Sequence, residues 1–215
     1  MILAIYGAGG LGVEVCELAL RINSLVKRWD AVIFIDDFRA PEAFRSSRTI
    51  NFDALCNEPD AVELVIGVGE PSSRSELYKK IRSLGMNLAT LIDPTAIVSP
   101  SAKIGSGTII CEFTSIHADV VIGDNCLLQP YCCIGHDIRV GSHSVLSAHC
   151  APGGKTNFGN RVFSGMNSSI KEGLNIGDDV VIAMGAAVFQ DLPDGVTVVG
   201  NPARITLGRK DRKVF

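Results

Sequence analysis

The best candidate for acid–base chemistry is a histidine followed directly by a carboxylate, His136 and Asp137. An imidazole can take a proton from an amine or a hydroxyl group as that group attacks a thioester, which speeds such a reaction by roughly 10²–10⁴-fold. The carboxylate of Asp137 could hold the ring in one tautomer. The other histidines, His117, His143 and His149, are not followed by a carboxylate. We therefore predict that His136 is a general base and that Asp137 orients it.

A second candidate site is a glycine-rich segment near the N-terminus. Residues 7–12 read Gly-Ala-Gly-Gly-Leu-Gly, which satisfies G-x-G-x-x-G, and Asp36 and Asp37 follow at about the distance found in dinucleotide sites. Backbone amides at the start of a helix bind phosphate well. However, about four strands surround this loop, which is half of a full dinucleotide fold. A loop in such a small domain fits a mononucleotide or a sugar-nucleotide diphosphate better than a dinucleotide. Asp36 and Asp37 could then contact the base or a sugar hydroxyl. An NAD-dependent enzyme is the alternative.

The seven cysteines are not expected to bind a metal or to react. None of them shows the CxxC spacing that zinc sites commonly use. Cys126, Cys132 and Cys150 recur at a position that a sequence repeat, described below, fills with small buried residues. No helix start or obvious base is placed to activate a thiolate, so a cysteine acyl-enzyme is not supported. Reduced thiols in a cytoplasm are the simplest interpretation.

The elements that must position these residues fall into two kinds. Residues 1–91 alternate between predicted strands (MILAIYG, AVIFIDD, ELVIGVG and NLATLID) and helices, the first of which starts at Leu11. Ser72 or Ser73 is expected to cap a second helix that runs to about Leu84. Near-continuous apolar strands separated by helices indicate a parallel sheet covered on both faces, that is, a Rossmann-like α/β domain.

From Ile92 the period changes to six residues and runs to Pro193 without an insertion. First positions are mostly large and apolar and fifth positions are small or aliphatic, so both are expected to face a narrow core. An apolar residue followed by glycine also recurs every 18 residues, which indicates three hexads per coil and a triangular cross-section. These pairs are Ile104-Gly105, Ile122-Gly123, Val140-Gly141, Phe158-Gly159 and Ile176-Gly177. We therefore predict a β-solenoid over residues 92–215, whose corners need small or positive-φ residues.

The repeat places the candidate base at or near a corner. His136 is the third residue of its hexad, and its stacked neighbours one coil away are the small residues Ala118 and Gly154. That leaves room beside the ring for a ligand. His143 and His149 are fourth residues of their hexads and are expected to face solvent or a subunit contact.

Composition excludes several classes of protein. A formal charge of -3 and a pI near 5.8 argue against nucleic-acid binding as the main role. No apolar run reaches the ~18 residues of a membrane span, and the N-terminus lacks the basic region and cleavage site of a signal peptide. With 47% hydrophobic residues, 22 glycines and 6% aromatics, the chain favours a β-branched core over a helical bundle. We expect a cytoplasmic protein with no membrane insertion.

Together these motifs resemble the sialic acid O-acetyltransferase / nucleotide-amino-sugar N-acetyltransferase family, which belongs to the hexapeptide-repeat acyltransferases. The resemblance covers essentially the whole chain and is carried by residues 7–10, 34–38, 66–74, 92–96 and 135–137. It implies a left-handed β-helix, a homotrimer and acetyl-CoA as the donor; the spacing of the cysteines, discussed above, leads us to expect no metal. It also implies that His136 is the general base, that Asp137 is its partner, and that the acceptor nucleotide contacts Gly9, Gly10, Leu11, Asp36, Asp37 and Gly69.

The same resemblance implies that acetyl-CoA lies along the solenoid. The donor contacts that it implies are Met166, Met184, the position of Val145, and Pro202 within the segment Gly200-Asn201-Pro202-Ala203 that closes the helix. Their positions in the repeat add Gly165 and Gly185, at or beside corners, and His143 as further candidates. This sequence departs from the family at Gln129, where members often carry Asn, and at Val145, where the N-acetyltransferases have a donor-contacting histidine. Asp137 is one methylene shorter than the glutamate that many members have there.

The first functional hypothesis is acetyl transfer from acetyl-CoA to the amino group of a nucleotide-activated amino sugar. Residues 1–91 would bind this acceptor and residues 92–215 would carry the catalytic residues. O-acetylation of a sialic acid-type sugar by the same groups is the second hypothesis, and a non-catalytic nucleotide-binding scaffold is an alternative of another class. Asp36, Asp37 and Phe38 favour the amino sugars, whereas residues 69–74 favour the sialic acid enzymes, so the sequence does not choose the sugar or the nucleotide.

Overall fold

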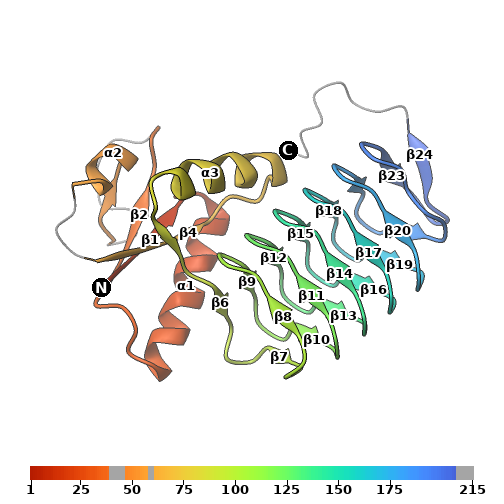
Figure 1. Cartoon of the computed structure of the whole chain (residues 1–215), viewed down its shortest axis with the longest axis horizontal. Helices are drawn as coiled ribbons and strands as arrows, with labels where there is room; N and C mark the ends of the chain where they lie inside the picture. The colour runs from red at the N-terminus through yellow and green to blue at the C-terminus, as the bar shows by residue number, and fades with distance from the viewer. Residues whose placement is uncertain (39–46, 58–60, 207–215) are drawn as a thin grey trace.

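The computed structural model describes residues 1–38, 47–57 and 61–206. A small parallel sheet with helices on both faces adjoins a long prism built from short strands (Figure 1). The predicted fold, a Rossmann-like α/β unit followed by a left-handed parallel β-helix, is confirmed. The last nine residues of the predicted second domain, 207–215, lie outside the described residues.

The first unit is a five-stranded sheet of order β3-β2-β1-β4-β5, in which every pairing is parallel. Its elements are β1 (Ile2–Tyr6), α1 (Gly10–Leu25), β2 (Ala31–Ile35), β3 (Thr49–Ile50), α2 (Phe52–Leu55), β4 (Val62–Ile66), α3 (Pro71–Ser83) and β5 (Asn87–Leu88). The chain leaves β1 toward one edge and returns at β4 toward the other. The loops after β1 and β4 therefore diverge, which opens a crevice at the carboxyl ends of these two strands.

Two details of the first unit differ from the predictions. The segment NLATLID is not one strand: β5 (Asn87–Leu88) completes the small sheet, and β6 (Leu91–Ile92) already belongs to the solenoid. Helix α3 is not capped by Ser72 or Ser73, because Pro71 occupies its first turn and Glu70 is the N-cap. Proline suits that position since its fixed φ matches the helix and it lacks an N–H that would stay unpaired.

The second unit is the predicted triangular solenoid, with three faces of stacked two-residue strands. The β6 face contains β6 (Leu91–Ile92), β9 (Ile109–Ile110), β12 (Leu127–Leu128), β15 (Val145–Leu146), β18 (Phe163–Ser164) and β21 (Val181–Ile182), and ends in β23 (Thr197–Val199) and antiparallel β24 (Arg204–Thr206). The β7 face contains β7 (Ile97–Val98), β10 (Ser115–Ile116), β13 (Cys133–Ile134), β16 (Ala151–Pro152), β19 (Ser169–Ile170) and β22 (Ala187–Val188). The β8 face contains β8 (Lys103–Ile104), β11 (Val121–Ile122), β14 (Arg139–Val140), β17 (Asn157–Phe158) and β20 (Asn175–Ile176).

The three corners are named here by one residue each. The Met166 corner joins the β6 and β7 faces, the His136 corner joins the β7 and β8 faces, and the Asn125 corner leads from the β8 face back to the β6 face. The core inside them is built as predicted, because the fifth residues of the hexads are buried from Thr108 to Leu192.

The 18-residue glycines serve close stacking rather than an unusual φ. A Cβ on Gly141 would lie 2.3 Å from the carbonyl oxygen of Gly159 in the next coil. The positive φ angles instead occur two residues later at each corner, mostly on non-glycine residues such as Asn125 (φ 52) and His143 (φ 64). Asn and Asp tolerate this left-handed region better than other side chains do.

The sheet unit is attached to the β6 face of the solenoid (Figure 1). Apolar residues of α1 share one hydrophobic cluster with Leu91, Ile109, Leu127 and Val145, which point outward from that face. Among the described residues, no helix is both long enough and apolar enough to cross a bilayer.

Candidate functional site

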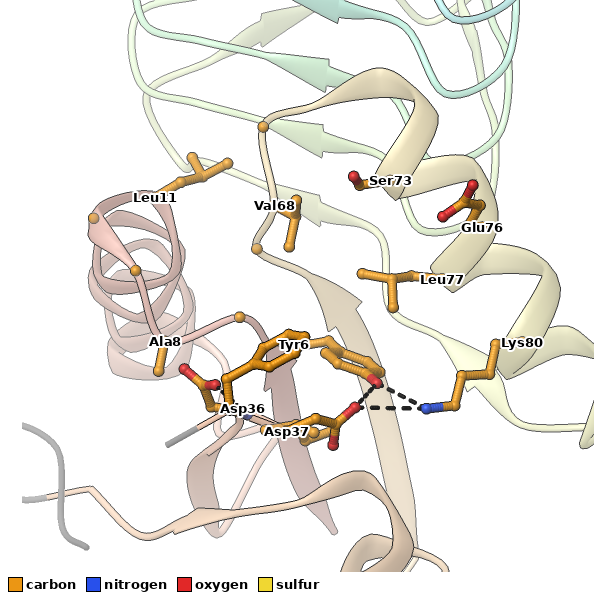
Figure 2. A pocket seen from close by; sticks show the side chains of 17 residues that line it. Tyr6, Ala8, Leu11, Asp36, Asp37, Val68, Ser73, Glu76, Leu77 and Lys80 are labelled. Atoms are coloured by element: carbon orange, nitrogen blue, oxygen red, sulfur yellow. Dashed lines mark hydrogen bonds and ion pairs between the residues drawn. The ribbon is translucent and has the colours of Figure 1, made fainter. Parts of the chain in front are cut away.

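A cleft of about 660 Å³ opens at the carboxyl ends of β1 and β4, where the order of the sheet reverses. It is lined by Gly9, Gly10 and Leu11 at the start of α1, by Asp36 and Asp37 after β2, by Gly69 after β4, and by one side of α3 (Figure 2). All six residues predicted to contact an acceptor therefore surround one cleft. Crevices at this point of parallel α/β sheets are where ligands bind.

The glycines after β1 have two different roles. A Cβ on Gly12 would lie 2.0 Å from the carbonyl oxygen of Gly7, so this glycine lets the helix pack closely on the strand. By contrast, no atom lies within 4 Å of where a Cβ would stand on Gly9 or Gly10. No side chain caps the N–H groups at the start of α1, and its first turn carries no acidic residue. The amides there and the open space beside them suit an anionic ligand such as a phosphate.

The two carboxylates after β2 are not equivalent. Asp37 accepts hydrogen bonds from the Tyr6 hydroxyl at 2.5 Å and from the Phe52 amide at 2.8 Å, and Lys80 Nζ lies 3.6 Å away. Burial opposes the charge on Asp37, but these donors outweigh it and hold the pKa of the carboxyl below its usual value. Burial and the Asp37 charge raise the pKa of Tyr6, so its phenol stays a donor. Both oxygens of Asp37 are thus engaged within the protein.

Helix α3 supplies a wall of the cleft that the sequence analysis did not identify. Ser73, Glu76, Leu77 and Lys80 all line the cleft (Figure 2). Their spacing of three and four residues is that of one helix face, and this was the available signal. This spacing alone does not indicate a ligand site, since any exposed side of a helix has the same spacing.

A buried arginine connects this cleft to the solenoid. Arg74 is fully buried and its guanidinium donates to the carbonyl oxygens of Ile66, Val68 and Asn125 and to Asn125 Oδ1, at 2.8–3.0 Å. It has no carboxylate partner among the described residues, and burial lowers its pKa to about 10. Ile66 and Val68 flank the Gly67 turn of the cleft. Arg74 therefore fixes this turn against the Asn125 corner.

The predicted base and its partner are in direct contact. His136 Nδ1 lies 2.8 Å from Asp137 Oδ2, and the two side chains are 59% and 51% exposed. Asp137 has a φ of 60°, which turns its side chain back beside the preceding ring. A Cβ on Gly154 would lie 2.8 Å from the His136 ring, so the ring occupies space that this glycine provides in the next coil. The contact at Nδ1 leaves Nε2, which lies beside Gly154, able to take a proton when Nδ1 carries the hydrogen.

The implied donor contacts lie at several separate places. Met166 and Met184 are exposed at the Met166 corner, where Gly165 packs against the Met184 amide and Gly185 has a φ of 67°. Pro202, exposed and preceded by a cis peptide bond, follows β23 near the end of the solenoid. The structure gathers Gly165, Met166, Met184 and Gly185 at one corner, but separates them from His136 by the width of the β7 face.

Two of the implied donor contacts lie against the sheet unit. Val145 is buried on the β6 face, in the cluster that contains the apolar residues of α1. His143 does not face solvent as expected: its ring packs edge-on against Tyr78 of α3 at 5.0 Å, and Nδ1 lies 3.0 Å from Asn125 Nδ2. Burial, followed by the charge of Arg74, lowers the pKa of His143 to about 4. The other fourth-position histidine, His149, is exposed as expected and stacks on Tyr131.

The cysteines predicted to fill the core do so. Cys126, Cys132 and Cys150 are almost completely buried, and burial raises the pKa of each thiol, that of Cys126 to about 11. Within the part of the chain that the structure describes, no group of three His, Cys, Asp or Glu side chains is arranged to hold a metal ion.

The cleft and His136 lie on different sides of the chain. Helices α1 and α3 sit over the β6 face and the Asn125 corner, whereas the His136 corner is the one opposite the β6 face (Figure 1). The structure therefore gathers the predicted acceptor contacts in one cleft and joins His136 to Asp137, but it does not bring the cleft and this pair together within one chain.

Comparison with known proteins agrees with this architecture. Residues 2–81 match the family described as the PglD N-terminal domain, and residues 119–151 match the bacterial transferase hexapeptide repeats. The acetyltransferase domain of PglB from Neisseria gonorrhoeae is 29% identical, with a TM-score of 0.89 over 95% of this chain and 99% of that one. The same domain has been solved in complex with acetyl coenzyme A, and that structure has the same identity and TM-score over 98% of its chain. PerB from Caulobacter crescentus, solved with CoA and GDP-perosamine, is 28% identical, with a TM-score of 0.85 over 96% of this chain and 97% of that one.

A curated relative matches over a shorter segment. The putative acetyltransferase YvoF of Bacillus subtilis is 42% identical over 50 residues, which are 23% of this chain and 29% of that protein. The match spans less than a third of the length of that relative. The sheet unit with its glycine-lined cleft therefore belongs to the PglD N-terminal domain family, and the solenoid with its His-Asp corner is built from bacterial transferase hexapeptide repeats. This is the architecture of the solved acetyltransferases that the chain resembles over nearly its whole length.

Proposed function

We propose that the protein transfers the acetyl group of acetyl-CoA to the amino group of a nucleotide-activated amino sugar. The observation that carries this proposal is the contact of His136 Nδ1 with Asp137 Oδ2 at 2.8 Å on an open corner of the solenoid. Similarity to enzymes described with acetyl coenzyme A and with GDP-perosamine supports the donor and the acceptor class. The free cysteines and the donor both fit a reducing cytoplasm.

In the proposed reaction, the sugar amine attacks the thioester carbonyl while His136 Nε2 takes a proton from the attacking nitrogen. A C–N bond forms, the tetrahedral intermediate collapses, and the C–S bond breaks to release CoA. The proton held by His136 is then available to the departing thiolate. Asp137 keeps the imidazole in the tautomer that presents an unprotonated Nε2 and stabilises the imidazolium that forms.

We propose that the acceptor occupies the cleft, with its diphosphate at the amides of Gly9, Gly10 and Leu11 and with Asp36 and Gly69 as further contacts. Met166, Met184, Gly165, Gly185 and Pro202 are the proposed contacts of the CoA tail. The buried position of Val145 and the packing of His143 against Tyr78 favour a supporting role for these two residues.

We also propose a homotrimer. The cleft lies over the β6 face and His136 lies at the opposite corner, so an acceptor bound in one copy needs the base of another. The β7 face offers a flat surface for this association, since its outward residues are mostly small: Ser115, Cys133, Ala151, Ser169 and Ala187.

The test is release of free CoA from acetyl-CoA across a panel of UDP-, GDP- and dTDP-linked amino sugars and sialic acids. Replacing His136 with Ala is expected to lower turnover by roughly 10²–10⁴-fold. His117→Ala is the matched control, because His117 is also an exposed histidine of the His136 corner but is not followed by a carboxylate. Near-normal turnover of the His136→Ala enzyme would sink the catalytic assignment. Faster release with sialic acids than with amino sugars would favour the O-acetyltransferase alternative.

A further inference from the structure

One end of the cleft is built from a charged cluster of three side chains, Tyr6, Asp37 and Lys80. Lys80 Nζ donates to the Tyr6 hydroxyl oxygen at 2.9 Å and lies 3.6 Å from Asp37 Oδ2 (Figure 2). The Tyr6 hydroxyl gives its own hydrogen to Asp37. The second Asp37 oxygen accepts from the Phe52 amide. The carboxylate is therefore satisfied by the protein, and it serves to hold Lys80 in place.

This arrangement leaves an N–H donor of Lys80 available at this end of the cleft. A lysine ammonium has three N–H bonds and no lone pair. Tyr6 takes one of them and the Asp37 charge attracts another, which leaves one for a ligand. The Phe52 ring centroid lies 4.0 Å from Nζ and supports the cation from behind. The Lys80 side chain is 44% exposed and borders the cleft, so a ligand can reach it.

The walls beside this donor are apolar. Val68 and Leu77 lie across from the Tyr6 ring between Lys80 and the start of α1 (Figure 2). An apolar wall next to a fixed donor suits a flat heterocycle better than it suits a phosphate, which would lose its hydration there and would also meet the nearby carboxylates of Asp37 and Glu76. The open amides at Gly9 and Gly10 already provide a phosphate site at the other wall of the cleft.

We propose that Lys80 selects the acceptor by its nucleobase, donating a hydrogen bond to the keto oxygen at position 4 of a pyrimidine or position 6 of a purine. This inference rests on the proposed function, which puts a nucleotide in the cleft. With the diphosphate at α1, the base edge farthest from the ribose reaches Lys80, and that edge carries these positions. A keto oxygen accepts this hydrogen bond. Cytosine and adenine carry an amino group at the same position, which is itself a donor and cannot accept a hydrogen bond from the Lys80 ammonium.

The test measures the affinity of the intact protein for matched nucleoside diphosphates by calorimetry. UDP and CDP differ at position 4, and IDP and ADP differ at position 6. The wild-type protein is expected to bind the keto member of at least one pair tighter by roughly tenfold or more, the size of a hydrogen bond to a charged group. In Lys80→Met, which keeps the apolar contact with Phe52, the keto-to-amino ratio should fall to about one.

Two further variants keep the test decisive. Lys79→Met removes the same charge from the neighbouring exposed position and should leave the ratio unchanged. Lys80→Gln restores a side chain that can both donate and accept, so it should bind both members of a pair with a ratio near one even if the Met variant binds neither.

Each contrary result has a separate meaning. Equal weakening of all four nucleotides in Lys80→Met would show that Lys80 contacts phosphate, and it would overturn the base assignment. Equal affinity of the wild type for both members of each pair would overturn it as well, with the proposed function intact. If the wild type binds none of the four, the nucleotide acceptor of the proposed function falls too.

Discussion

Arg74 Nη2 lies 2.8 Å from Asn125 Oδ1, so a helix of the sheet unit is bonded directly to a corner of the solenoid. Asn125 Nδ2 in turn donates to the Arg74 carbonyl oxygen and contacts His143 Nδ1. Because Arg74 also holds the carbonyl oxygens of Ile66 and Val68, the same residue positions the floor of the cleft and anchors it to the solenoid. The position of a bound acceptor relative to the solenoid thus depends on this pair.

Asn125→Ala should lower the free energy of unfolding far more than the cost of placing alanine at a left-handed φ angle. The change removes the acceptor of a buried guanidinium N–H and the donor to two further groups, which we expect to cost about 2–4 kcal/mol. Asn167→Ala is the matched control, since Asn167 is also a corner residue with a φ of 57°, but it is exposed and makes no side-chain hydrogen bond among the described residues. The control should cost about 1 kcal/mol from the left-handed backbone alone. Urea unfolding of both variants checks this, and equal losses would contradict the role given to the Arg74 contact.

Stability should fall as the pH drops from 6.5 toward 4 because of His143. Its pKa is lowered to about 4 in the folded protein, against 6.5 in an unperturbed histidine, so the unfolded chain binds the proton first. The stabilisation is therefore complete above pH 6.5 and is lost progressively below it. The full shift corresponds to about 3 kcal/mol, and solvent screening of a half-buried ring reduces our expectation to about 1–2 kcal/mol.

The control for this pH effect is His143→Gln. Glutamine does not titrate, and its side-chain oxygen can still accept from Asn125 Nδ2. Urea unfolding at pH 7.5 and pH 5 should show a smaller loss in His143→Gln than in the wild type. An identical loss in both proteins would mean that other groups, such as paired carboxylates, account for the whole dependence.

Alanine substitutions should separate the two kinds of glycine after β1. Gly12→Ala would force a Cβ to within 2.0 Å of the Gly7 carbonyl oxygen, and we expect a loss of more than about 3 kcal/mol or no folded protein. Gly9→Ala and Gly10→Ala meet no atom within 4 Å, so their melting temperatures should stay close to that of the wild type. The same two variants should raise the KM for the acceptor, with the KM for acetyl-CoA unchanged. A melting temperature that falls equally in all three would contradict this division.

The solenoid was predictable because its repeat constrains every coil in the same way. A hexad with large first and small fifth residues has one inward solution, and burial from Thr108 to Leu192 follows it. The small sheet was predicted less completely, because the two-residue strand β3 and the one-turn helix α2 carry too few residues to show a period. The split of NLATLID into β5 and β6 also had no local signal, since both halves are apolar and only the packing assigns Leu88 and Leu91 to different sheets.

In the candidate site too, only features that lie in adjacent residues could be predicted from the sequence. His136 with Asp137 and the residues at positions 7–12 could be recognised because their chemistry lies in adjacent residues. Lys80 and Arg74 could not, since each meets its partners only through tertiary contacts, Lys80 with Tyr6 and Arg74 with Asn125. The expectation that His143 faces solvent or a subunit contact left out α3 for a related reason: the repeat describes the solenoid alone, and only the tertiary packing places Tyr78 against this ring.

The separation of the cleft from His136 gives the sharpest prediction about assembly, because two inactive proteins should restore each other. Gly10→Asp puts a negative charge into the open space at the start of α1 and should block phosphate binding. His136→Ala lacks the base. If each acceptor cleft uses the His136 of a neighbouring copy, a mixed assembly contains sites in which the cleft of a His136→Ala subunit meets the base of a Gly10→Asp subunit.

Random assembly from equal amounts of the two subunits should make about a quarter of all sites competent. Co-expression with two different affinity tags, tandem purification and a CoA-release assay measure this, with each parent expressed alone as the inactive baseline. Parents mixed after assembly, without subunit exchange, should stay inactive, which excludes a reaction between separate particles. A co-assembled preparation as inactive as either parent would mean that cleft and base come from the same chain. That outcome would require the acceptor to reach from the β6 face around to the opposite corner of its own solenoid, against the arrangement seen here.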